Sequence, residues 1–474
     1  MTLNGTSRNP ALIAAAVASA IAAYGIGRVI VDDMAARALA IFVLAAVFWA
    51  AEALSLSATA LVVVGLEILF LASDGGLADE VTRLLQLAGL ADERPLEIAP
   101  ISASAFVSPL ASDIIMLFLG GFLVAAAVTK HGVDVVLAGR LLRPFTRSPL
   151  VLVYGLAGLS AFFSMWMSNT ATAAMMVALV GPILTHMPAG GRFRAAVLLS
   201  IAFGANIGGI GTPIGTPPNA IAFAALNRAG YEITFLRWMA IAVPLEILLL
   251  ASAGIVLRWL FKPSPGLRLA VSVPSRRLSS EGTITLVVLA AAILLWMTGS
   301  QHGLTPGTVA LLAATMLLAA GIISHRDLDA VDWKILILMW GALSLGVAVD
   351  RSGLGGHLSR MDLSALPGGI WSVGTVIALT GVGVSTFMSN TAVAALLVPM
   401  ALAVSLPGRE EFAILAALAC SFAMAMPVST PPNAIAYGTG DVPRGLMVQS
   451  GGLISAIGML LLLVGYHVVL PLAF

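Results

Sequence analysis

The feature that most constrains the fold is a succession of long apolar stretches without charged residues. Between Arg147 and Arg192 about forty consecutive positions carry no Asp, Glu, Lys or Arg, and further uncharged runs follow Arg194 and Glu281. A stretch of about 18 or more such residues can cross a bilayer as a helix. Charged residues make up only 10% of the 474 residues, and the mean hydropathy is +1.02. The chain is therefore predicted to be an all-α protein that crosses the membrane many times.

Eleven segments are predicted to span the membrane, at approximately 12–31, 37–55, 57–73, 113–130, 195–225, 240–261, 283–299, 305–323, 333–350, 411–437 and 447–473. Two further apolar segments, 148–187 and 369–406, each carry the polar triplet Ser-Asn-Thr near the middle. We expect these two segments to enter the membrane as re-entrant hairpins, with pairs of full spans as the alternative. The single cysteine, Cys420, excludes a disulfide within the chain.

The chain contains an internal repeat. The triplet that begins at Ser168 recurs at Ser389. The segment Thr216–Ala222 (TPPNAIA) recurs, at nearly the same offset along the chain, as Thr430–Ala436. Two occurrences of the same pair of motifs, in the same order, indicate two related halves. The predicted organisation is an N-terminal extra helix (1–36), a first repeat (37–261), a linker (262–282) and a second repeat (283–474).

The repeat predicts an inverted topology. Each half holds five spans, an odd number, so the second half must enter the membrane from the opposite face. Secondary transporters are built in this way, with binding sites near the bilayer midplane on interrupted helices. If the N-terminus is cytoplasmic, 15 of the 24 Lys and Arg residues lie on the inner side. The positive-inside rule therefore favours a cytoplasmic N-terminus and linker and a periplasmic C-terminus.

The triplets suggest an anion site. Ser168, Asn169 and Thr170 would lie at the tip of the first hairpin, where non-helical backbone is tolerated only beside protein or a watery cavity. The helix that begins after the tip would direct its free N–H groups at that cavity, and such groups favour anions. Asn390 and Thr391 repeat the arrangement in the second half. Two facing triplets predict a site for a carboxylate substrate between the repeats.

The same segments also carry groups suited to cations. Ser164 and Ser168 are spaced i, i+4, as are Ser385 and Ser389, which places each pair of hydroxyls on one helical face. The prolines of both TPPN segments are expected to interrupt helical hydrogen bonding and to supply unwound backbone. Hydroxyl, amide and carbonyl oxygens suit a hard ion such as Na⁺. Since neither cluster contains a charged residue, bound cations would neutralise the substrate.

Other classes of protein fit the sequence less well. Small polar residues can simply pack membrane helices together, but a duplicated two-motif pattern argues against that interpretation. The chain has no H-E-x-x-H, G-x-S-x-G or P-loop motif, so an enzyme is not expected. A channel is the third alternative, and interrupted helices in two inverted halves favour alternating access. Glu52, Glu67, Asp113 and Glu246 lie in or at the ends of spans, where a carboxylate suggests a functional role. Asp113 is expected to start a helix at the interface. For Glu246, ion coupling and an ordinary buried hydrogen bond are both open interpretations.

At these residues the chain resembles the divalent anion/sodium symporter family, which transports dicarboxylates, tricarboxylates and, in some members, sulfate. Both triplets match the family, as do Gly215–Ala222 (GTPPNAIA) and Thr430–Ala436. The segment Trp49–Leu61 (WAAEALSLSATAL) is similar to the family pattern W-x-x-E-A-x-P-x-P-x-T-A-L. It has Ser55 and Ser57 where prolines are common, which puts the kink of this span in question. The resemblance covers essentially the whole chain after the first span.

The resemblance implies a set of ligands for each half. The first Na⁺ site would use Ser164, Ser168, Asn169 and the backbone near Gly215, and the second Ser385, Asn390 and the backbone near Ser429. The substrate carboxylates would be held by Asn169, Thr170, Thr216, Asn390, Thr391, Thr430 and Pro431. Family members are typically homodimers in which a transport domain moves like an elevator against a scaffold. The spans at 57–73, 113–130, 305–323 and 333–350 would belong mainly to that scaffold.

We therefore expect a secondary transporter of the bacterial inner membrane that imports C4-dicarboxylates such as succinate, malate or fumarate together with Na⁺. The alternatives are a dicarboxylate or citrate exchanger without Na⁺ coupling and a sulfate transporter of the same family.

Overall fold

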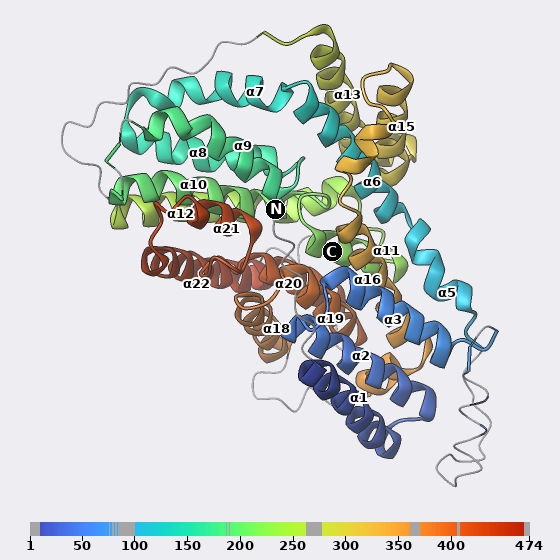
Figure 1. Ribbon diagram of the computed structural model, residues 1–474. Coiled ribbons are helices and arrows are strands. Elements are labelled where there is room, and N and C mark those ends of the chain that lie inside the picture. Colours follow the sequence, from blue (N-terminus) through green and yellow to red (C-terminus); the bar gives the residue numbers. More distant parts are fainter. Residues whose placement is uncertain are drawn as a thin grey trace.

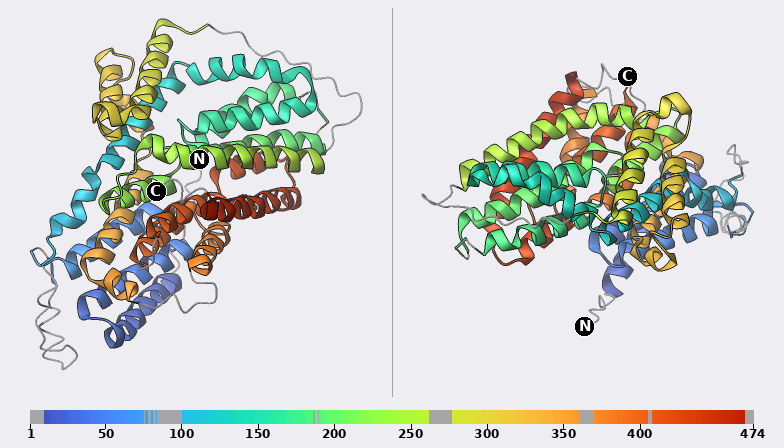
Figure 2. Two further views of the ribbon diagram at one scale, coloured as in Figure 1. Left: turned by 180° about the vertical axis from the view of Figure 1, so that it is seen from behind. Right: turned by 90° about the horizontal axis from the view of Figure 1, so that it is seen from above.

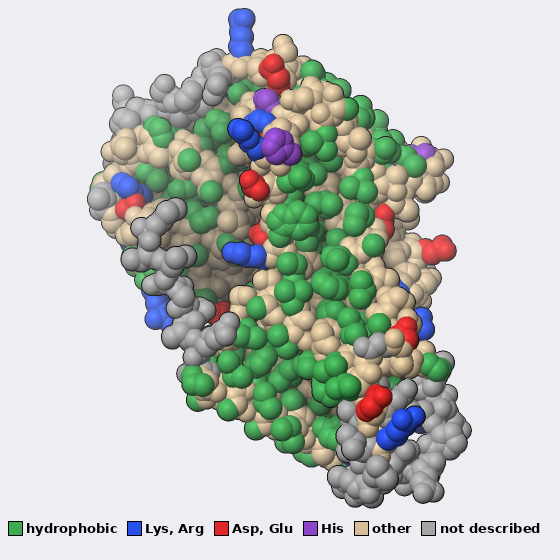
Figure 3. Space-filling view, turned by 45° about the vertical axis from the view of Figure 1, so that its right-hand side comes forward, with side chains coloured by type: hydrophobic (Ala, Val, Ile, Leu, Met, Phe, Trp, Pro, Cys, Tyr) green, Lys and Arg blue, Asp and Glu red, His purple; other side chains and the backbone are tan. Residues whose placement is uncertain are grey.

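The computed structural model describes residues 10–74, 76–77, 80, 83, 100–185, 187–188, 190–261, 277–360, 370–404 and 408–468. Regular structure within these residues is helical, which confirms the predicted all-α fold. Eight of the described helices are long and apolar enough to cross a membrane, and six more apolar helices have 10–17 residues. The face drawn in Figure 3 is mostly apolar or neutral with few charged side chains, as a lipid-facing surface requires.

The helices form two blocks that lie side by side (Figure 1). The first, here called the column, consists of α1 (Pro10–Ile30), α2 (Asp33–Ala51), α3 (Leu56–Leu71), α5 (Ala103–Val107), α6 (Asp113–Lys130), α13 (Ser280–Met297), α14 (Gly299–His302), α15 (Pro306–Ala319) and α16 (Trp333–Arg351). The second, here called the hairpin block, consists of α7 (Val133–Leu142), α8 (Pro149–Ser164), α9 (Asn169–Leu184), α10 (Arg192–Gly208), α11 (Pro217–Arg228), α12 (Phe235–Leu260), α17 (Leu354–Ser359), α18 (Ile370–Ser385), α19 (Asn390–Ala403), α20 (Arg409–Ser421), α21 (Pro431–Gly438) and α22 (Arg444–Val468). The view from behind shows the same division (Figure 2).

The column is held together by two matching close approaches of helix backbones. A Cβ atom on Gly120 of α6 would lie 2.5 Å from the carbonyl carbon of Ala310 on α15. A Cβ atom on Gly341 of α16 would lie 2.5 Å from the Cβ of Ala60 on α3. Small residues allow membrane helices to pack at such short range. Gly341 follows Gly120 at the same spacing that separates the two triplets, so both repeats use the same contact.

The starts of α3 and α15 show the same duplication. Trp49 donates its indole N–H to the carbonyl of Leu56 at 3.2 Å, and Trp296 donates to the carbonyl of Pro306 at 3.0 Å. The side chain of Ser55 caps α3, whereas Thr305 caps α15. Ser55 thus begins α3 as a capped helix start, without the proline that the resemblance led us to expect at this position.

Each triplet joins two helices that pack against each other, α8 with α9 and α18 with α19. Ser168 has an extended backbone and its hydroxyl accepts a hydrogen bond from the N–H of Ala171 at 3.2 Å, so it caps α9 after the turn that follows α8. Ser389 has the same extended conformation before α19. The polar residues therefore mark the places where the backbone leaves the helical conformation.

The structure corrects several sequence-based element assignments. The predicted spans 195–225 and 411–437 are each divided, into α10 and α11 and into α20 and α21. Pro217 and Pro431 occupy the first turns of α11 and α21, where the missing N–H has no cost, so the unwound backbone precedes the prolines. The helices α5 and α7 were not predicted, because both are short. The first nine residues, linker residues 262–276 and most of 75–99 lie outside the described residues.

Candidate anion and cation sites

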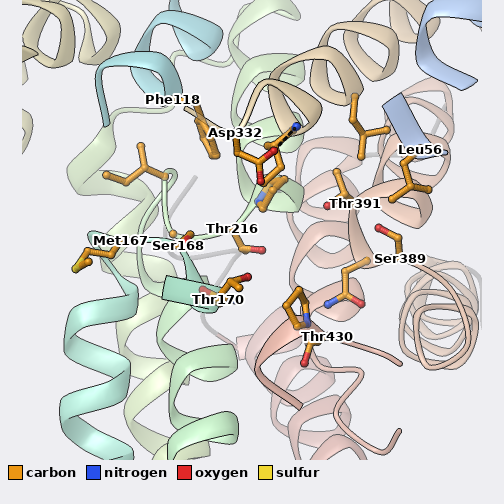
Figure 4. Close-up of a pocket in the computed structure, with 18 of the residues that line it drawn as sticks. Leu56, Phe118, Met167, Ser168, Thr170, Thr216, Asp332, Ser389, Thr391 and Thr430 are labelled. Atoms are coloured by element: carbon orange, nitrogen blue, oxygen red, sulfur yellow. Dashed lines mark hydrogen bonds between the residues drawn. The ribbon is translucent and has the colours of Figure 1, made fainter. Parts of the chain in front are cut away.

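A cavity of about 620 Å³ lies between the two blocks. Its floor is formed by both triplets and both TPPN segments, and its walls by α6 and α16 of the column. In Figure 4, Ser168, Thr170 and Thr216 approach from one side of this space and Ser389, Thr391 and Thr430 from the other. The cavity has a volume typical of sites for small ligands.

Most of the residues predicted to bind the anion or the cations line this cavity, and they come from both halves of the chain: Ser168, Asn169, Thr170, Gly215, Thr216, Asn390, Thr391, Ser429, Thr430 and Pro431. The other two, Ser164 and Ser385, are fully buried behind the triplets. The structure therefore brings residues from distant parts of the sequence into one place. Their roles as ligands stay predictions.

The electrostatics of the cavity come from helix ends. The helices α9, α11, α19 and α21 all begin at its lining, so their free N–H groups and positive dipole ends gather there. No Lys, Arg or His is found among the described residues that line it, and the only charged ones are Glu52 and Asp332. Glu52 ends α2 with a left-handed backbone, and Asp332 caps α16. An anion in this cavity would be held by neutral groups.

Two matching asparagines stabilise the interrupted helices. Asn219 donates through its amide nitrogen to the carbonyls of Gly209, Ile210 and Thr212, at 2.8–3.1 Å. Asn433, which holds the same place in the second TPPN motif, donates to the carbonyls of Met424 and Met426, at 2.9 and 3.0 Å. A buried carbonyl without a partner is costly. The Asn of each TPPN motif therefore serves the broken end of the preceding helix, a role that the sequence analysis missed.

The two repeats are also joined to each other at their centre. Asn206 of α10 donates its amide N–H to the side-chain oxygen of Asn433 at 3.0 Å, and both residues are buried. The residue that matches Asn206 in the second repeat is Cys420. One amide bridge thus links the interrupted helices of opposite halves.

A second pair of hydrogen bonds ties each hairpin tip to the neighbouring unwound segment. Thr212 donates to the carbonyl of Met165 at 2.6 Å, and Ser429 donates to the carbonyl of Thr386 at 2.9 Å. Met165 and Thr386 match when the two triplets are aligned, but Thr212 and Ser429 do not match when the TPPN segments are aligned. The two halves reach the same carbonyl from different positions, so sequence comparison did not reveal this contact.

The predicted cation ligands differ in their hydrogen bonding. In the first repeat, Ser164 donates to the side-chain oxygen of Asn169 at 2.5 Å. In the second repeat, the matching hydroxyl of Ser385 and side-chain oxygen of Asn390 are both buried and do not bind each other; the hydroxyl has a side-chain hydrogen bond only with the thiol of Cys420. Hydroxyl and amide oxygens are ligands that fit Na⁺. No cluster of three or more His, Cys, Asp or Glu residues suited to other metals is found in the described part of the chain.

The wall of the cavity beside the first triplet is aromatic. Trp166 stacks on Trp296 with ring centroids 6.4 Å apart, and Trp296 stacks on Phe235 at 5.3 Å. Trp166 lines the cavity, while Phe235 and Trp296 line a second cavity of about 790 Å³ at the other end of the blocks. The stacked rings therefore separate the two cavities.

The column contacts the hairpin block unequally. α16 packs against α11 and α19, whereas α6 does not pack comparably against the matching helices α21 and α9 in the part of the chain that the structure describes. Arg228 of α11 also donates to the carbonyl of Leu343 on α16 at 3.0 Å. The hairpin block therefore packs closely against α16 on one side of the cavity and only loosely against α6 on the other.

The buried carboxylates have separate places. Glu67 of α3 accepts a hydrogen bond from Ser344 of α16 inside the column. Glu246 of α12 is 4% exposed, and one of its oxygens has no hydrogen-bond partner. That oxygen faces Gly211, where a Cβ atom would lie only 2.2 Å from it. Asp113 starts α6, as expected, and accepts the N–H of Gly307 on α15 at 3.1 Å. None of these three carboxylates lines the cavity of about 620 Å³ that the triplets form.

Comparisons with known proteins agree with this arrangement. The family model described as citrate transporter matches residues 46–419 and 309–474. The chain is 31% identical over 447 residues to a protein of Haemophilus influenzae called an uncharacterized transporter, covering 90% of each chain. It is 29% identical over 401 residues to the sodium-dependent dicarboxylate transporter SdcS of Staphylococcus saprophyticus, covering 76% of this chain and 77% of that protein.

A solved structure shares the fold. The YdaH transporter of Alcanivorax borkumensis, whose crystal structure was described as having an unusual topology, superimposes with a TM-score of 0.57. The match covers 88% of this chain and 100% of that chain, at 14% sequence identity. The relatives are transporters, which confirms that the chain is a transporter and not an enzyme. The resemblance drawn from the repeated triplets is confirmed as well, and the chain belongs to the citrate transporter family.

Proposed function

We propose that the protein is a secondary transporter that takes up C4-dicarboxylates, such as succinate, malate or fumarate, together with Na⁺. The observation that carries this proposal is the cavity between four helix N-termini, lined by two matching Ser-Asn-Thr triplets and by no basic residue among its described lining. The names of two staphylococcal relatives, sodium-dependent dicarboxylate transporters, support the choice of substrate and ion.

The facing triplets suit an anion with two carboxylates. One carboxylate would meet the start of α9 with Asn169 and Thr170, and the other the start of α19 with Asn390 and Thr391. Each helix end offers N–H groups and a positive dipole. The side chains of Thr216 and Thr430 lie next to the triplets and would add hydroxyl donors.

Na⁺ would supply the positive charge that the protein lacks. The first ion would be held by Ser164, Ser168, Asn169 and the backbone at Gly215, and the second by Ser385, Asn390 and the backbone at Ser429. The only charges among the described lining residues, Glu52 and Asp332, are negative. A bound dicarboxylate therefore needs cations nearby, which couples the two binding events.

Transport would proceed by alternating access. The hairpin block would move like an elevator along the column, which acts as the scaffold and contains α3, α6, α15 and α16. With the N-terminus in the cytoplasm of a bacterial inner membrane, the cavity mouth at Glu52 and Asp332 would face the cytoplasm. This arrangement corresponds to an inward-facing state with the C-terminus in the periplasm. A homodimer is proposed from the family resemblance.

The test is uptake of labelled succinate into proteoliposomes with and without an inward Na⁺ gradient. We expect uptake to require the gradient and to be inhibited by unlabelled malate and fumarate. Uptake that ignores Na⁺ but requires internal dicarboxylate would identify an exchanger. Stronger inhibition by citrate or sulfate than by fumarate would assign the alternative substrates of the family.

A further inference from the structure

The two predicted cation sites are not equal in their unliganded hydrogen bonding. Ser164 matches Ser385, and Asn169 matches Asn390, when the two triplets are aligned. In the first repeat the hydroxyl and the amide oxygen bind each other at 2.5 Å. In the second repeat both oxygens are buried, and neither is bonded to the other or to another nitrogen or oxygen atom. The same two groups therefore bind each other in one half and not in the other.

The surroundings of the second pair do not remove this difference. The hydroxyl of Ser385 has a side-chain hydrogen bond with the thiol of Cys420, and sulfur is a weaker partner than the amide oxygen that Ser164 binds. Ser429 is occupied by the carbonyl of Thr386 and the N–H of Met426. These two bonds hold the unwound segment in position without using the oxygens of Ser385 or Asn390. The second site is therefore preorganised, with the Asn390 oxygen unpaired and the Ser385 hydroxyl only weakly held.

The backbone carbonyls of the interrupted helices show the same imbalance. In the first repeat, Asn219 binds three carbonyls, including that of Gly209. In the second repeat, the described bonds of Asn433 reach two carbonyls and omit Ala423, which matches Gly209. A buried oxygen without a donor is destabilising, and a bound cation removes that penalty. The unpaired oxygen of Asn390 therefore favours a larger gain on binding Na⁺ in the second repeat.

We propose that the second-repeat site, built around Ser385 and Asn390, is the tighter Na⁺ site and fills before the first-repeat site. The proposal rests on the Na⁺ coupling proposed above. It adds an order of binding: Na⁺ enters the second site with little rearrangement. At the first site, Ser164 must share or give up its bond to Asn169 when the ion arrives.

The experiment measures the melting temperature of the purified full-length protein against Na⁺ concentration without dicarboxylate, with choline keeping the ionic strength constant. Ligand binding to the folded state raises the melting temperature, so the tighter site dominates the low-concentration part of the curve. For Ser385→Ala we expect the Na⁺ concentration at half of the rise to increase at least about tenfold. For Ser164→Ala we expect an increase of less than about threefold.

Ser200→Ala and Ser421→Ala are the matched controls, because each hydroxyl is buried and bonded to a carbonyl of its own helix. Both should leave the Na⁺ dependence unchanged. If Ser385→Ala fails to fold, Asn390→Ala and Asn169→Ala provide the same comparison. A larger or equal shift in the first-repeat variant would overturn the proposed order while leaving Na⁺ coupling intact. A wild-type melting temperature that ignores Na⁺ would instead overturn the coupling itself.

Discussion

The two repeats carry the same motifs but face the column differently. In the first repeat, Trp166 stacks on Trp296 of the column, 6.4 Å between ring centroids. The matching residue of the second repeat, Phe387, is 71% exposed. Arg228 likewise binds the carbonyl of Leu343 on α16, whereas the position that matches it in the second repeat holds Val442. If the hairpin block moves as proposed, the contacts that have no counterpart in the other repeat are those expected to change, and the contacts duplicated in both repeats are those expected to hold the column rigid.

Breaking the close helix contact that is duplicated in both repeats should have the largest effect on the melting temperature. Gly120→Val and Gly341→Val each place a branched side chain where a Cβ atom already lies 2.5 Å from the facing helix. Overpacking of this kind costs about 3 kcal/mol or more because backbone must move. We expect both variants to lower the melting temperature strongly and by similar amounts. Gly65→Val is the control, because its Cβ would meet nothing within 4 Å. A tolerant response at one of the two glycines would contradict the shared role of the contact.

Breaking a contact that has no counterpart in the other repeat should shift the conformational equilibrium and leave the free energy of unfolding nearly unchanged. Arg228→Met removes the bond to Leu343, worth about 1 kcal/mol for a partly exposed group, or roughly a fivefold change in population. Arg228 lies at the end of α11 away from the cavity, since Pro217 at the start of this helix lines it. If the bond to Leu343 stabilises the proposed inward-facing state, its loss should make the cavity open less often. A cysteine at Leu56, which lines the cavity, should then react more slowly with a membrane-impermeant thiol reagent. The native Cys420 is fully buried and gives little background.

Arg228→Lys is the companion variant, because it keeps the charge and one donor. It should restore part of the labelling rate. Faster labelling in Arg228→Met than in the wild type would mean that this bond does not stabilise the state in which the cavity is open.

The smallest effect is expected in the loops that match between the repeats. The loop before α16 is tied by Asp327, which accepts a hydrogen bond from Lys130 at 2.7 Å. This bond and the N–H of Ser324 lower the pKa of Asp327 to about 2. The ionised Asp327 therefore stabilises the folded protein above the ordinary carboxyl pKa, and this stabilisation is lost as the pH falls toward 2. Lys130 is exposed and Asp327 is partly exposed, so solvent weakens the pair and we expect a contribution to stability of less than about 1 kcal/mol.

The matching loop of the first repeat is tied by Asp74, which accepts the hydroxyl of Ser102 and the N–H of Ala103, both at 2.6 Å. These bonds lower the pKa of Asp74.

Asp327→Asn should flatten the loss of melting temperature between about pH 4 and pH 2 only slightly. An acid profile identical to the wild type would show that the Lys130 pair carries no stability.

Sequence reasoning located the cavity because its lining depends on local motifs. The triplets and TPPN segments interrupt helices wherever they occur, and the repeat requires that they meet near one plane. It did not find Arg228, Phe235 or Trp296, because those contacts depend on where the hairpin block sits along the column. Two inverted repeats allow two positions related by a pseudo-two-fold axis, and motifs present in both halves cannot distinguish them. Thr212 was also missed, because its second-repeat equivalent is Met426 and the same bond is made there by Ser429.

The central claim is that one dicarboxylate binds between the two repeats and is held by both. Its most direct test is calorimetric binding of succinate at saturating Na⁺ to Thr170→Ala, Thr391→Ala and the double variant. Each single substitution removes one donor and should weaken binding by about 0.5–1.5 kcal/mol, or more if the bond is to a charged carboxylate. The double variant should lose about the sum, because the two hydroxyls contact opposite ends of the ligand. Normal expression with unchanged affinity in both single variants would contradict the account and leave the triplets with a packing role.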